Sequence, residues 1–532
     1  MTSKGPSIVT IGCRELAAAE PTLASVGFKA YNLWRMARLG LPVPPAYVLG
    51  TEVCQRRIRG EASDAVLSHA LDAGIERLES ATGLKLGDPR RPLVVSVRSG
   101  APVSMPGMLD TVLDVGLNDA TLRGVIRLTG RPRTAWDSYR RLVQSFATVV
   151  ERREARAFDA QAGSAMRAAG VADVRSLDFR EMRSLAGSYL ETYESVVGKP
   201  FPQDPRRQLL AAAAAVFDSW RSPKAVAYRA LNGIDDAMGT AATVQQMVYG
   251  NAGAHSGSGV GFTRDPVSGA RTRYLDFLFN AQGEDVVSGR RAADAAVGLA
   301  DLLPGVQREI DSAAELLERE FGDMQEFEFT VQEGRLFMLQ TRAGKRTPLA
   351  AARIAVDMVA EGLLTPAAAL ERLKDVDLSR VVRVRRVSDA GGVIGHGIAA
   401  STGIASGPAA LEPGAALELA RRGTPPILVR ESPATEDIEA LASSAGLLTA
   451  NGARTAHAAV VARQLGKVCV LSCRELAFDG ASGRCTIGAR PLVAGEVITL
   501  DGDRGEVLRG PANVVAEPAR DLLDAIEGWS RA

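Results

Sequence analysis

The stretch that decides the fold is Gly446-Leu-Leu-Thr-Ala-Asn-Gly-Ala-Arg-Thr-Ala-His-Ala-Ala-Val-Val-Ala-Arg-Gln-Leu-Gly466. An apolar strand runs into an Asn-Gly turn, and we expect a helix that starts near His457, stops at Gly466 and has Thr455 as its N-cap. His457 then lies at a helix N-terminus, where the helix dipole favours a neutral imidazole and a bound anion. A nucleophile that accepts a phosphoryl group needs both properties, and the alternative is a histidine that only packs in a turn.

A hairpin between Glu326 and Arg342 is the second informative stretch. A three-residue loop ending at Gly334, in the left-handed conformation, would place Glu326 opposite Gln340. Strand alternation then puts Glu326, Glu328, Gln340 and Arg342 on one face of the hairpin. Two carboxylates beside an arginine suit a magnesium-bound phosphate chain, and the alternative is an ordinary half-exposed hairpin.

Basic residues next to glycine form the third set. Lys29 opens a helix two residues after Gly27, and Arg98 ends a β-branched strand. The glycine-rich segment 255–259 precedes a strand that carries Arg264. Glycine loops let backbone N–H groups approach phosphate oxygens, while Lys and Arg neutralise the charge of a transferred phosphoryl group. Each of these features alone is common in proteins.

Length and composition exclude several classes of protein. The 532 residues suggest about three domains, and the 63 basic and 62 acidic side chains give no net field that would attract nucleic acid. No stretch approaches the roughly 18 apolar residues of a membrane-spanning helix, and no signal-peptide core is present. We therefore expect a cytoplasmic protein that binds neither nucleic acid nor a membrane. The five cysteines predict free buried thiols rather than a disulfide framework or a zinc site.

The order of patterns along the chain predicts an α/β (α+β) fold. Residues 1–120 mix helical and strand patterns, 120–230 are mostly helical, and 240–345 return to strands. Two helical stretches between 345 and 386 then connect to a glycine-rich segment of short strands at 393–515.

Taken together, these segments closely resemble the pyruvate, phosphate dikinase family. The matching stretches are, in chain order, 27–45, 95–119, 201–204, 239–266, 280–289, 326–347 and 435–473. The resemblance implies an ATP-grasp nucleotide-binding domain at 1–345 with a helical insert at about 120–230, and then a linker at 346–390. A swivelling β/β/α phosphohistidine domain would follow at 391–515, with a tail at 516–532.

The resemblance also implies a reaction and its residues. In that family a histidine takes a pyrophosphoryl group from ATP, passes one phosphoryl to phosphate and the other to pyruvate, and so forms phosphoenolpyruvate, AMP and diphosphate. By motif position His457 is the carrier, Glu326 and Glu328 bind Mg²⁺, and Thr455 is a candidate regulatory site. Residues 245–248 would line the adenine pocket, and a loop at 256–259 would cover the phosphates. The implied ATP and phosphate set is Lys29, Arg98, Gln245, Met247, Val248, Ser256, Gly257, Gly259, Glu328, Gln340 and Arg342.

The sequence departs from the family pattern in three places. Glu326 stands where the family has Asp, which keeps the metal-binding carboxylate, and Ala456 stands where it usually has Ser, which puts tuning by a hydroxyl group in doubt. The family's third part is a (β/α)₈ barrel of about 250 residues, whereas only 516–532 follow the predicted carrier domain. We therefore expect pyruvate to be bound by a separate acceptor chain, with the linker as a hinge.

Two alternatives stay open at this point: transfer to another small-molecule acceptor, and a catalytically silent ATP-binding regulatory protein. The helical insert could support a homodimer.

Overall fold

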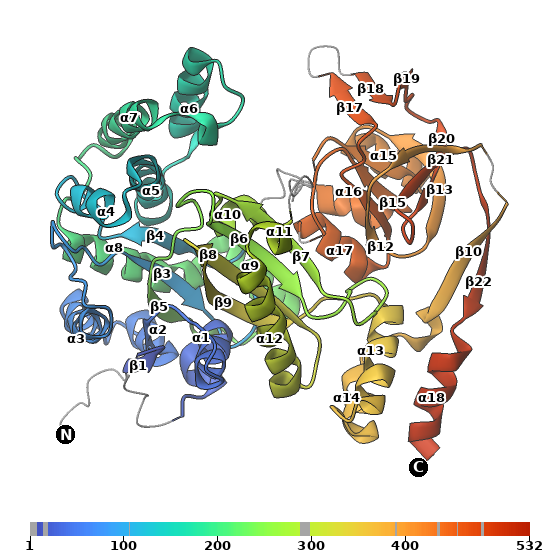
Figure 1. The fold of residues 1–532 in the computed structure, drawn as a ribbon, viewed down its shortest axis with the longest axis horizontal. Coiled ribbons are helices and arrows are strands. Elements are labelled where there is room, and N and C mark those ends of the chain that lie inside the picture. The colour runs from blue at the N-terminus through green and yellow to red at the C-terminus, as the bar shows by residue number, and fades with distance from the viewer. Residues whose placement is uncertain are drawn as a thin grey trace. The chain divides into compact units, whose positions relative to one another are not determined.

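The computed structural model describes residues 8–13, 20–105, 107–287, 298–388, 391–432, 437–454, 456–479 and 484–531 (Figure 1). The chain divides into two compact units. The first is Met1–Gly253 with Phe337–Gln340, and the second is Ala254–Leu336 with Thr341–Ala532. Helices and strands are mixed in both units, which confirms the predicted fold class.

A five-stranded antiparallel sheet organises the first unit, in the order β1-β2-β5-β3-β4. Its helices α1 and α8 pack on β3 and β5. Apolar side chains of the sheet and helices join in one core, which explains why β2 and most of β3 are buried. The bounds are β1 Ile8–Ile11, α1 Leu23–Arg38, β2 Ala46–Leu49, α2 Thr51–Ile58, α3 Asp64–Thr82, β3 Val95–Gly100, β4 Thr111–Val115 and β5 Ala241–Gln246.

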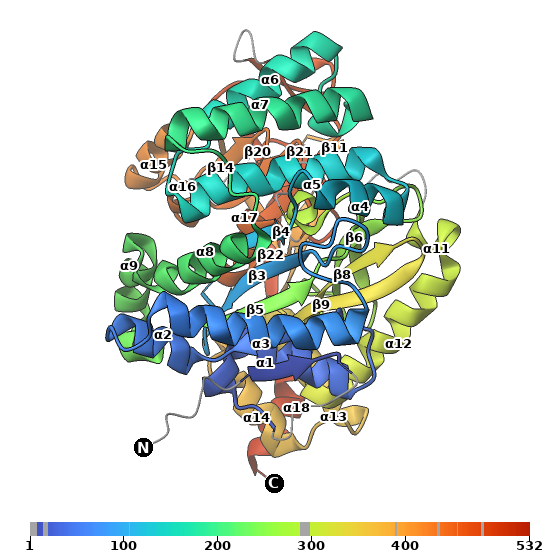
Figure 2. The ribbon, with the colours of Figure 1, turned by 90° about the vertical axis from the view of Figure 1, so that its left-hand side faces the viewer.

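The predicted helical insert is confirmed. Helix α7 packs against both α5 and α6 (Figure 2). The helical pattern is interrupted, however, by a π-helical turn at Phe146–Val150 and by Arg152, whose φ is +54°. The bounds are α4 Thr121–Thr129, α5 Pro132–Ser145, α6 Arg156–Ala169, η2 Val174–Ser176, α7 Phe179–Val197, α8 Pro205–Asp218, η3 Ser219–Arg221, α9 Pro223–Asn232 and η4 Asp236–Met238.

A four-stranded sheet opens the second unit, in the order β7-β6-β8-β9. Its strands are β6 Gly257–Phe262, β7 Tyr274–Phe279, β8 Gln325–Gln332 and β9 Arg335–Ala343, and its helices are α10 Gly283–Val287, α11 Leu299–Leu302 and α12 Pro304–Phe321. Strand β6 has glycine at every second position because phenylalanine rings occupy that face. A Cβ atom there would meet a ring at 2.2 Å (Gly257 and Phe277), 2.4 Å (Gly259 and Phe329) or 2.3 Å (Gly261 and Phe327).

The turn between β8 and β9 has two residues, so the expected three-residue loop is wrong. Glu333 and Gly334 both have positive φ, +50° and +77°, as in the type I′ turn that matches the twist of a two-residue hairpin. The Thr341 hydroxyl donates to the Glu326 carbonyl at 3.3 Å and links the two strands near their far ends.

The connection contains the two predicted helices, α13 Pro348–Ala360 and α14 Pro366–Leu373. The short helix η5 Leu378–Arg380 leads into β10 Val382–Ser388, which pairs antiparallel with β22 Asn513–Pro518. Helix α18 Arg520–Arg531 packs on α13 and α14, so the segment expected to be a tail contributes to the core of the connection.

The C-terminal part of the second unit is a compact α/β domain around an eight-stranded sheet, in the order β11-β21-β20-β13-β14-β15-β16-β12. Strands β13 to β16 are parallel neighbours, and β14 to β16 are buried on both faces except at Arg430, as expected for parallel strands. Alternate side chains point into two cores, one shared with the small sheet β17-β18-β19 and one with helices α15 to α17. The bounds are β11 Val393–His396, β12 Ile398–Ser401, β13 Ile404–Ala410, α15 Pro413–Arg421, β14 Ile427–Arg430, α16 Ile438–Ser443, β15 Gly446–Thr449, α17 His457–Leu465, β16 Val468–Leu471, β17 Leu476–Asp479, β18 Arg484–Ile487, β19 Arg490–Pro491, β20 Val497–Asp501 and β21 Glu506–Arg509.

All five cysteines are free, and four of them are buried, as the sequence predicts. None of the described helices combines the length and apolar character needed to cross a bilayer.

Candidate functional site

Lys29 is positioned by a kink in α1. Gly27 has φ +77° inside the helix, and the next residue, Phe28, donates its N–H to the carbonyl of Ala101 at 2.8 Å. A Cβ atom on Gly27 would lie 1.8 Å from the carbonyl oxygen of Gly100, so only glycine lets α1 approach the end of β3 this closely. Lys29 therefore lies beside Gly100, two residues beyond Arg98.

Arg98 and Gln245 lie on one face of the first sheet, on neighbouring strands. The Arg98 Nη1 atom donates to the Gln245 Oε1 atom at 3.4 Å, and Gln245 in turn donates to the carbonyl of Pro44 at 3.1 Å. The structure thus brings together two predicted ligands, and Gln245 orients Arg98.

Thr243 is a polar residue on this face that the sequence analysis missed. It is paired directly with Arg98 across β5 and β3, and its buried hydroxyl has no hydrogen-bond partner in the part of the chain that the structure describes. Alternation along β5 could have identified it, since Thr243 lies two residues before Gln245. In an apolar strand, however, a single threonine looks like an ordinary β-former.

Met247 and Val248 follow β5 directly. The Met247 N–H donates to the Val94 carbonyl at 2.9 Å, and Val248 is buried. This backbone tie fixes the segment expected to line an adenine pocket against the strand that carries Arg98.

In the second unit, Glu326 and Arg342 form the predicted pair. The Arg342 Nη2 atom donates to the Glu326 Oε1 atom at 2.6 Å. Burial alone would lower the pKa of Arg342, but the charge and hydrogen bond of Glu326, together with the charge of Glu328, raise it above its ordinary value. Each partner keeps one unsatisfied buried atom among the described residues, Oε2 of Glu326 and Nε of Arg342.

These unsatisfied atoms fit a metal-bound phosphate. A free carboxylate oxygen suits Mg²⁺, and a free guanidinium N–H suits a phosphate oxygen. Over the described ranges no cluster of three or more ligating side chains is present. Two protein carboxylates are nevertheless ordinary for Mg²⁺, which takes its remaining ligands from phosphate and water.

Gln340 lies on β9 and is buried, within the Phe337–Gln340 segment that belongs to the first unit. Glu326 belongs to the second unit, so the expected place of Gln340 on the same face as Glu326 stays a prediction.

Ser256, Gly257 and Gly259 do not form the expected phosphate-covering loop. Gly257 and Gly259 lie inside β6, paired with both β7 and β8, because their missing side chains make room for the phenylalanine rings. The Ser256 hydroxyl accepts from the N–H of Glu333 at 2.9 Å and holds the hairpin turn.

Arg264 has a structural role rather than a phosphate-binding one. It is fully buried and donates to Glu318 and Glu361, with Arg264 Nη2 contacting a Glu361 oxygen at 2.6 Å.

His457 is the first residue of α17, as predicted, and the helix ends at Gly466 with φ +64°. Its N-cap position is Ala456, which makes no side-chain cap. Thr455, the expected cap and candidate regulatory residue, lies outside the described residues.

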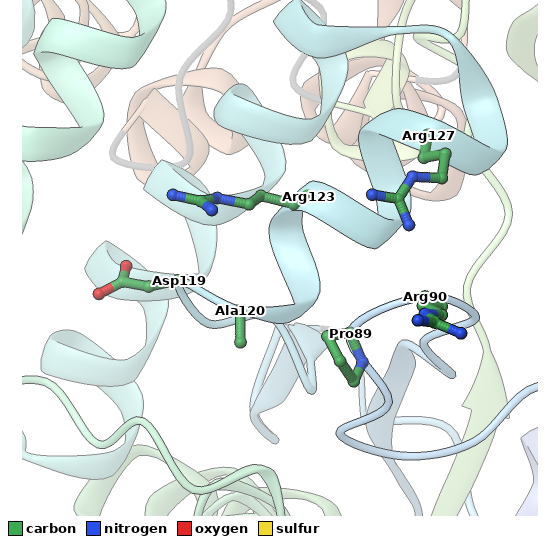
Figure 3. A pocket seen from close by; sticks show the side chains of 6 residues that line it. All are labelled: Pro89, Arg90, Asp119, Ala120, Arg123 and Arg127. Carbon is green, nitrogen blue, oxygen red and sulfur yellow. The ribbon is translucent and has the colours of Figure 1, made fainter.

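Two hollows of the described structure are lined by other residues. One, of about 300 Å³, lies on the first unit and is lined by Pro89, Arg90, Asp119, Ala120, Arg123 and Arg127. Figure 3 shows the Arg123 guanidinium pointing away from those of Arg90 and Arg127, so the three cations do not converge. The other, of about 380 Å³, lies in the second unit beside α13 and α14. Neither hollow contains a predicted nucleotide ligand.

Comparison with known proteins matches two family models. Residues 54–313 match the pyruvate phosphate dikinase AMP/ATP-binding domain, and residues 423–505 match the mobile domain of PEP-utilising enzymes. The second match contains α17 and His457.

Curated relatives match along nearly the whole chain. It is 42% identical to pyruvate, phosphate dikinase 1 of Zea mays over 91% of its length, and 40% identical to pyruvate, phosphate dikinase of Rhizobium meliloti over 99%. It is 38% identical to the enzyme of the same name from Clostridium symbiosum over 95%. The chain spans 52%, 60% and 58% of the length of these three relatives. With both domain matches, the chain belongs to the pyruvate, phosphate dikinase family and carries its AMP/ATP-binding and mobile domains.

Proposed function

We propose that this chain transfers a pyrophosphoryl group from ATP to His457, and that phosphate and pyruvate accept its two phosphoryl groups. The products would be AMP, diphosphate and phosphoenolpyruvate. The observation that carries the proposal is the Glu326–Arg342 pair, in which each partner keeps one unsatisfied buried atom, one suited to a cation and one to an anion.

The residues divide into two roles. Glu326 and Glu328 would hold Mg²⁺, which would shield the phosphate charge, and Arg342 would bind a phosphate oxygen. Lys29 and Arg98 would neutralise further phosphate charge, with Gln245 orienting Arg98 at 3.4 Å. Met247 and Val248 would contact the adenine.

His457 would act as the nucleophile. A neutral imidazole nitrogen would form a bond to the β-phosphorus while the bond from that phosphorus to AMP breaks. The position of His457 at the start of α17 supports this role, because a helix N-terminus stabilises negative charge. Phosphate would then take the terminal phosphoryl group, which leaves a single phosphoryl group on His457 for pyruvate.

The experiment uses ATP labelled separately at the β and γ phosphates, with Mg²⁺ and the intact chain. Both labels are expected on the protein in an acid-labile form, and added phosphate should release the γ label while the β label remains. His457→Ala should abolish both. The matched control is His396→Ala, which changes an exposed histidine of the same domain. Acid-labile label that persists in His457→Ala would contradict the proposal.

Intact mass after addition of pyruvate tests the acceptor. Discharge of the β phosphoryl group is expected with pyruvate, on this chain or with an added acceptor chain. Discharge only by another small hydroxylated compound would favour a phosphotransferase with a different acceptor. ATP binding without any transfer would favour a catalytically silent regulatory protein. The cytoplasmic location and the homodimer stay predictions.

A further inference from the structure

The face of the second sheet that carries Glu326 also carries an aromatic row. Phe262 on β6 is paired with Tyr274 on β7 and with Glu326 on β8. Directly paired residues on neighbouring strands share a face, so Tyr274, Phe262 and Glu326 form a row across three strands. One pair further along, Asp276, Val260 and Glu328 form the next row on that face.

Two arginines of the mobile domain lie on the first row. The Arg454 guanidinium carbon is 4.5 Å from the Tyr274 ring centroid, and that of Arg463 is 5.8 Å from the Phe262 ring centroid. Arg463 is buried at 1% exposure and donates to the carbonyl of Ala400 at 3.1 Å. Both distances are within the range of cation–π attraction.

Arg454 also forms an ion pair with Asp265. Its Nη1 atom lies 2.8 Å from Asp265 Oδ2, and both side chains are 16% exposed. The other carboxylate oxygen, Oδ1, accepts the N–H groups of Val267 and Ser268 at 2.8 Å each. The backbone turn that follows Asp265 thus orients its carboxylate and leaves Oδ2 available to Arg454.

The pKa of Asp265 agrees with this arrangement. Burial alone would raise it, but the backbone donors and the Arg454 charge outweigh burial and hold it below its ordinary value. Asp265 is therefore ionised at neutral pH and able to pair with Arg454.

The two arginines bracket the carrier histidine in sequence. Arg454 lies three residues before His457, and Arg463 lies six residues after it on the same helix. Contacts on both sides of His457 therefore fix α17 over the face that carries Glu326.

We infer that Arg454 is a positioning residue for phosphoryl transfer, which docks the His457 segment on the nucleotide-binding sheet through Asp265 and Tyr274. The inference rests on the proposed function and adds a residue and a docking surface to it. Arg454 contacts neither ATP nor the metal in this role, and it acts by fixing the approach of α17.

The strength of the Arg454–Asp265 contact suits a mobile domain that must undock after the transfer. Arg264 makes four hydrogen bonds to Glu318 and Glu361 on α12 and just after α13, which is a permanent tie between the sheet and the connection. Arg454 makes one ion pair and one ring contact, and its Nε has no partner among the described residues. A single partly exposed ion pair is modest in strength, so the docked state can be both populated and released.

The test uses the intact chain with Arg454→Met, Asp265→Asn and the double variant. The conservative variant is Arg454→Lys. The matched control is Arg490→Met, which breaks an ion pair to Glu496 of 2.7 Å inside the mobile domain. Three quantities are measured for each: the single-turnover rate of His457 labelling from ATP, the Kd of ATP, and the radius of gyration by small-angle X-ray scattering. Thermal unfolding checks that each variant is folded.

Each single variant should slow labelling about tenfold, in the range usual for coupling between sites, while the Kd of ATP stays within about twofold. The radius of gyration should rise because the mobile domain spends less time docked. The double variant should be no slower than either single variant, since both remove the same pair. Arg454→Lys should restore most of the rate, and Arg490→Met should resemble the unaltered chain.

Wild-type labelling rates with an unchanged radius of gyration in both single variants would overturn the inference, as would additive losses in the double variant. If the unaltered chain takes no label from ATP, the proposed function fails. The scattering comparison then still decides whether Arg454 and Asp265 dock the domain.

Discussion

Gly27 shows how one residue positions a charge. Its φ of +77° and a carbonyl oxygen 1.8 Å from where a Cβ atom would lie allow α1 to pass over the end of β3. This approach places Lys29 beside Gly100, two residues beyond Arg98, although 69 positions separate Lys29 from Arg98 in the sequence. Gly27 therefore positions Lys29, a proposed nucleotide ligand, and has no ligand contact of its own in this role.

Gly27→Ala should lower the free energy of unfolding by about 3 kcal/mol or more, because the strain of a left-handed alanine adds to the clash of its Cβ atom with the Gly100 carbonyl. Gly40→Ala is the matched control, since Gly40 has φ +78° just after the same helix and nothing within 4 Å of an added Cβ atom. It should cost only about 1 to 2 kcal/mol. Urea unfolding measures both, and equal costs would show that the close approach to Gly100 is unimportant.

Glu326→Gln tests the proposed Mg²⁺ site. The amide keeps the shape of the side chain but loses the charge that pairs with Arg342 at 2.6 Å. His457 labelling should fall about a hundredfold, the usual loss when one charge-stabilising group is removed, and the Mg²⁺ concentration for half-maximal rate should rise. Glu326→Asp retains a carboxylate and should keep most of the activity. An unchanged Mg²⁺ dependence in Glu326→Gln would rule out the proposed ligand.

Glu326 and Arg342 could be identified from the sequence as a pair of opposite charges, because spacing along a hairpin limits which side chains can meet. Thr243 and Asp276 could not, because a threonine or an aspartate in a strand has many ordinary roles. Thr243 pairs directly with Arg98, and Asp276 lies in the same row as Glu328 with Val260 between them. Both places follow only from pairing between strands.

At the scale of elements, the hairpin shows what limits a prediction from spacing. Its strands were expected correctly, but the turn has two residues because Glu333 adopts a positive φ, which sequence preference assigns to glycine or asparagine. The glycines of β6 show the reverse case. A glycine-rich segment suggested a phosphate loop, whereas the phenylalanines of β7 and β8 take up the space and make it a strand.

Helix α5 contains a buried carboxylate whose charge depends on its neighbours. Asp137 is 2% exposed and pairs with Arg140 at 2.6 Å and Arg141 at 3.1 Å. Burial alone would raise the pKa of Asp137, but the two arginines outweigh it and lower the pKa from 3.8 to about 2. Stability from this shift is present above about pH 4 and is lost as the pH falls through 2.

Asp137→Asn should therefore lower the free energy of unfolding at pH 7 by about 2 to 3 kcal/mol, the equivalent of a shift of about two pKa units. The difference from the unaltered chain should shrink as the pH falls towards 2. Urea unfolding followed by tryptophan fluorescence reports on this unit, since Trp34, Trp136 and Trp220 all lie in it. A difference that stays constant between pH 7 and pH 2.5 would contradict the assigned pKa.

At the scale of the whole molecule, the sequence predicts the order of helical and strand regions along the chain, but not the contacts between residues far apart in it. Helical and strand periodicity predicted the helical insert, the connection and the C-terminal domain because each pattern is local. The Arg454–Asp265 ion pair joins residues 189 positions apart, and no local pattern predicts it. The role of α18 was missed for the same reason, because its partners α13 and α14 precede it by more than 140 residues.

The free cysteines provide a test of both units at once. Burial raises the pKa of Cys54, Cys473 and Cys485 to about 11 and that of Cys469 to about 12, from an ordinary value of 9.0. Because the folded-state values are raised, the stability that they contribute is present below pH 9 and is lost as the pH rises towards 11 to 12. At pH 8 these four side chains are therefore protonated and shielded, whereas Cys13 is only partly buried.

A thiol reagent at pH 8 should consequently modify at most one cysteine of the native chain within minutes, with Cys13 as the site identified by peptide mass. In urea all five should react, and the order of exposure shows whether the units open separately, because Cys13 and Cys54 lie in the first unit and the other three in the second. Cys13→Ser is the control and should remove the rapid reaction. Cys469 lies on β16 and packs in the same core as α17. Rapid modification of Cys469 in the native chain would mean that the C-terminal domain opens readily. The contacts of Arg454 and Arg463 would then hold α17 less firmly than the burial of Arg463 implies.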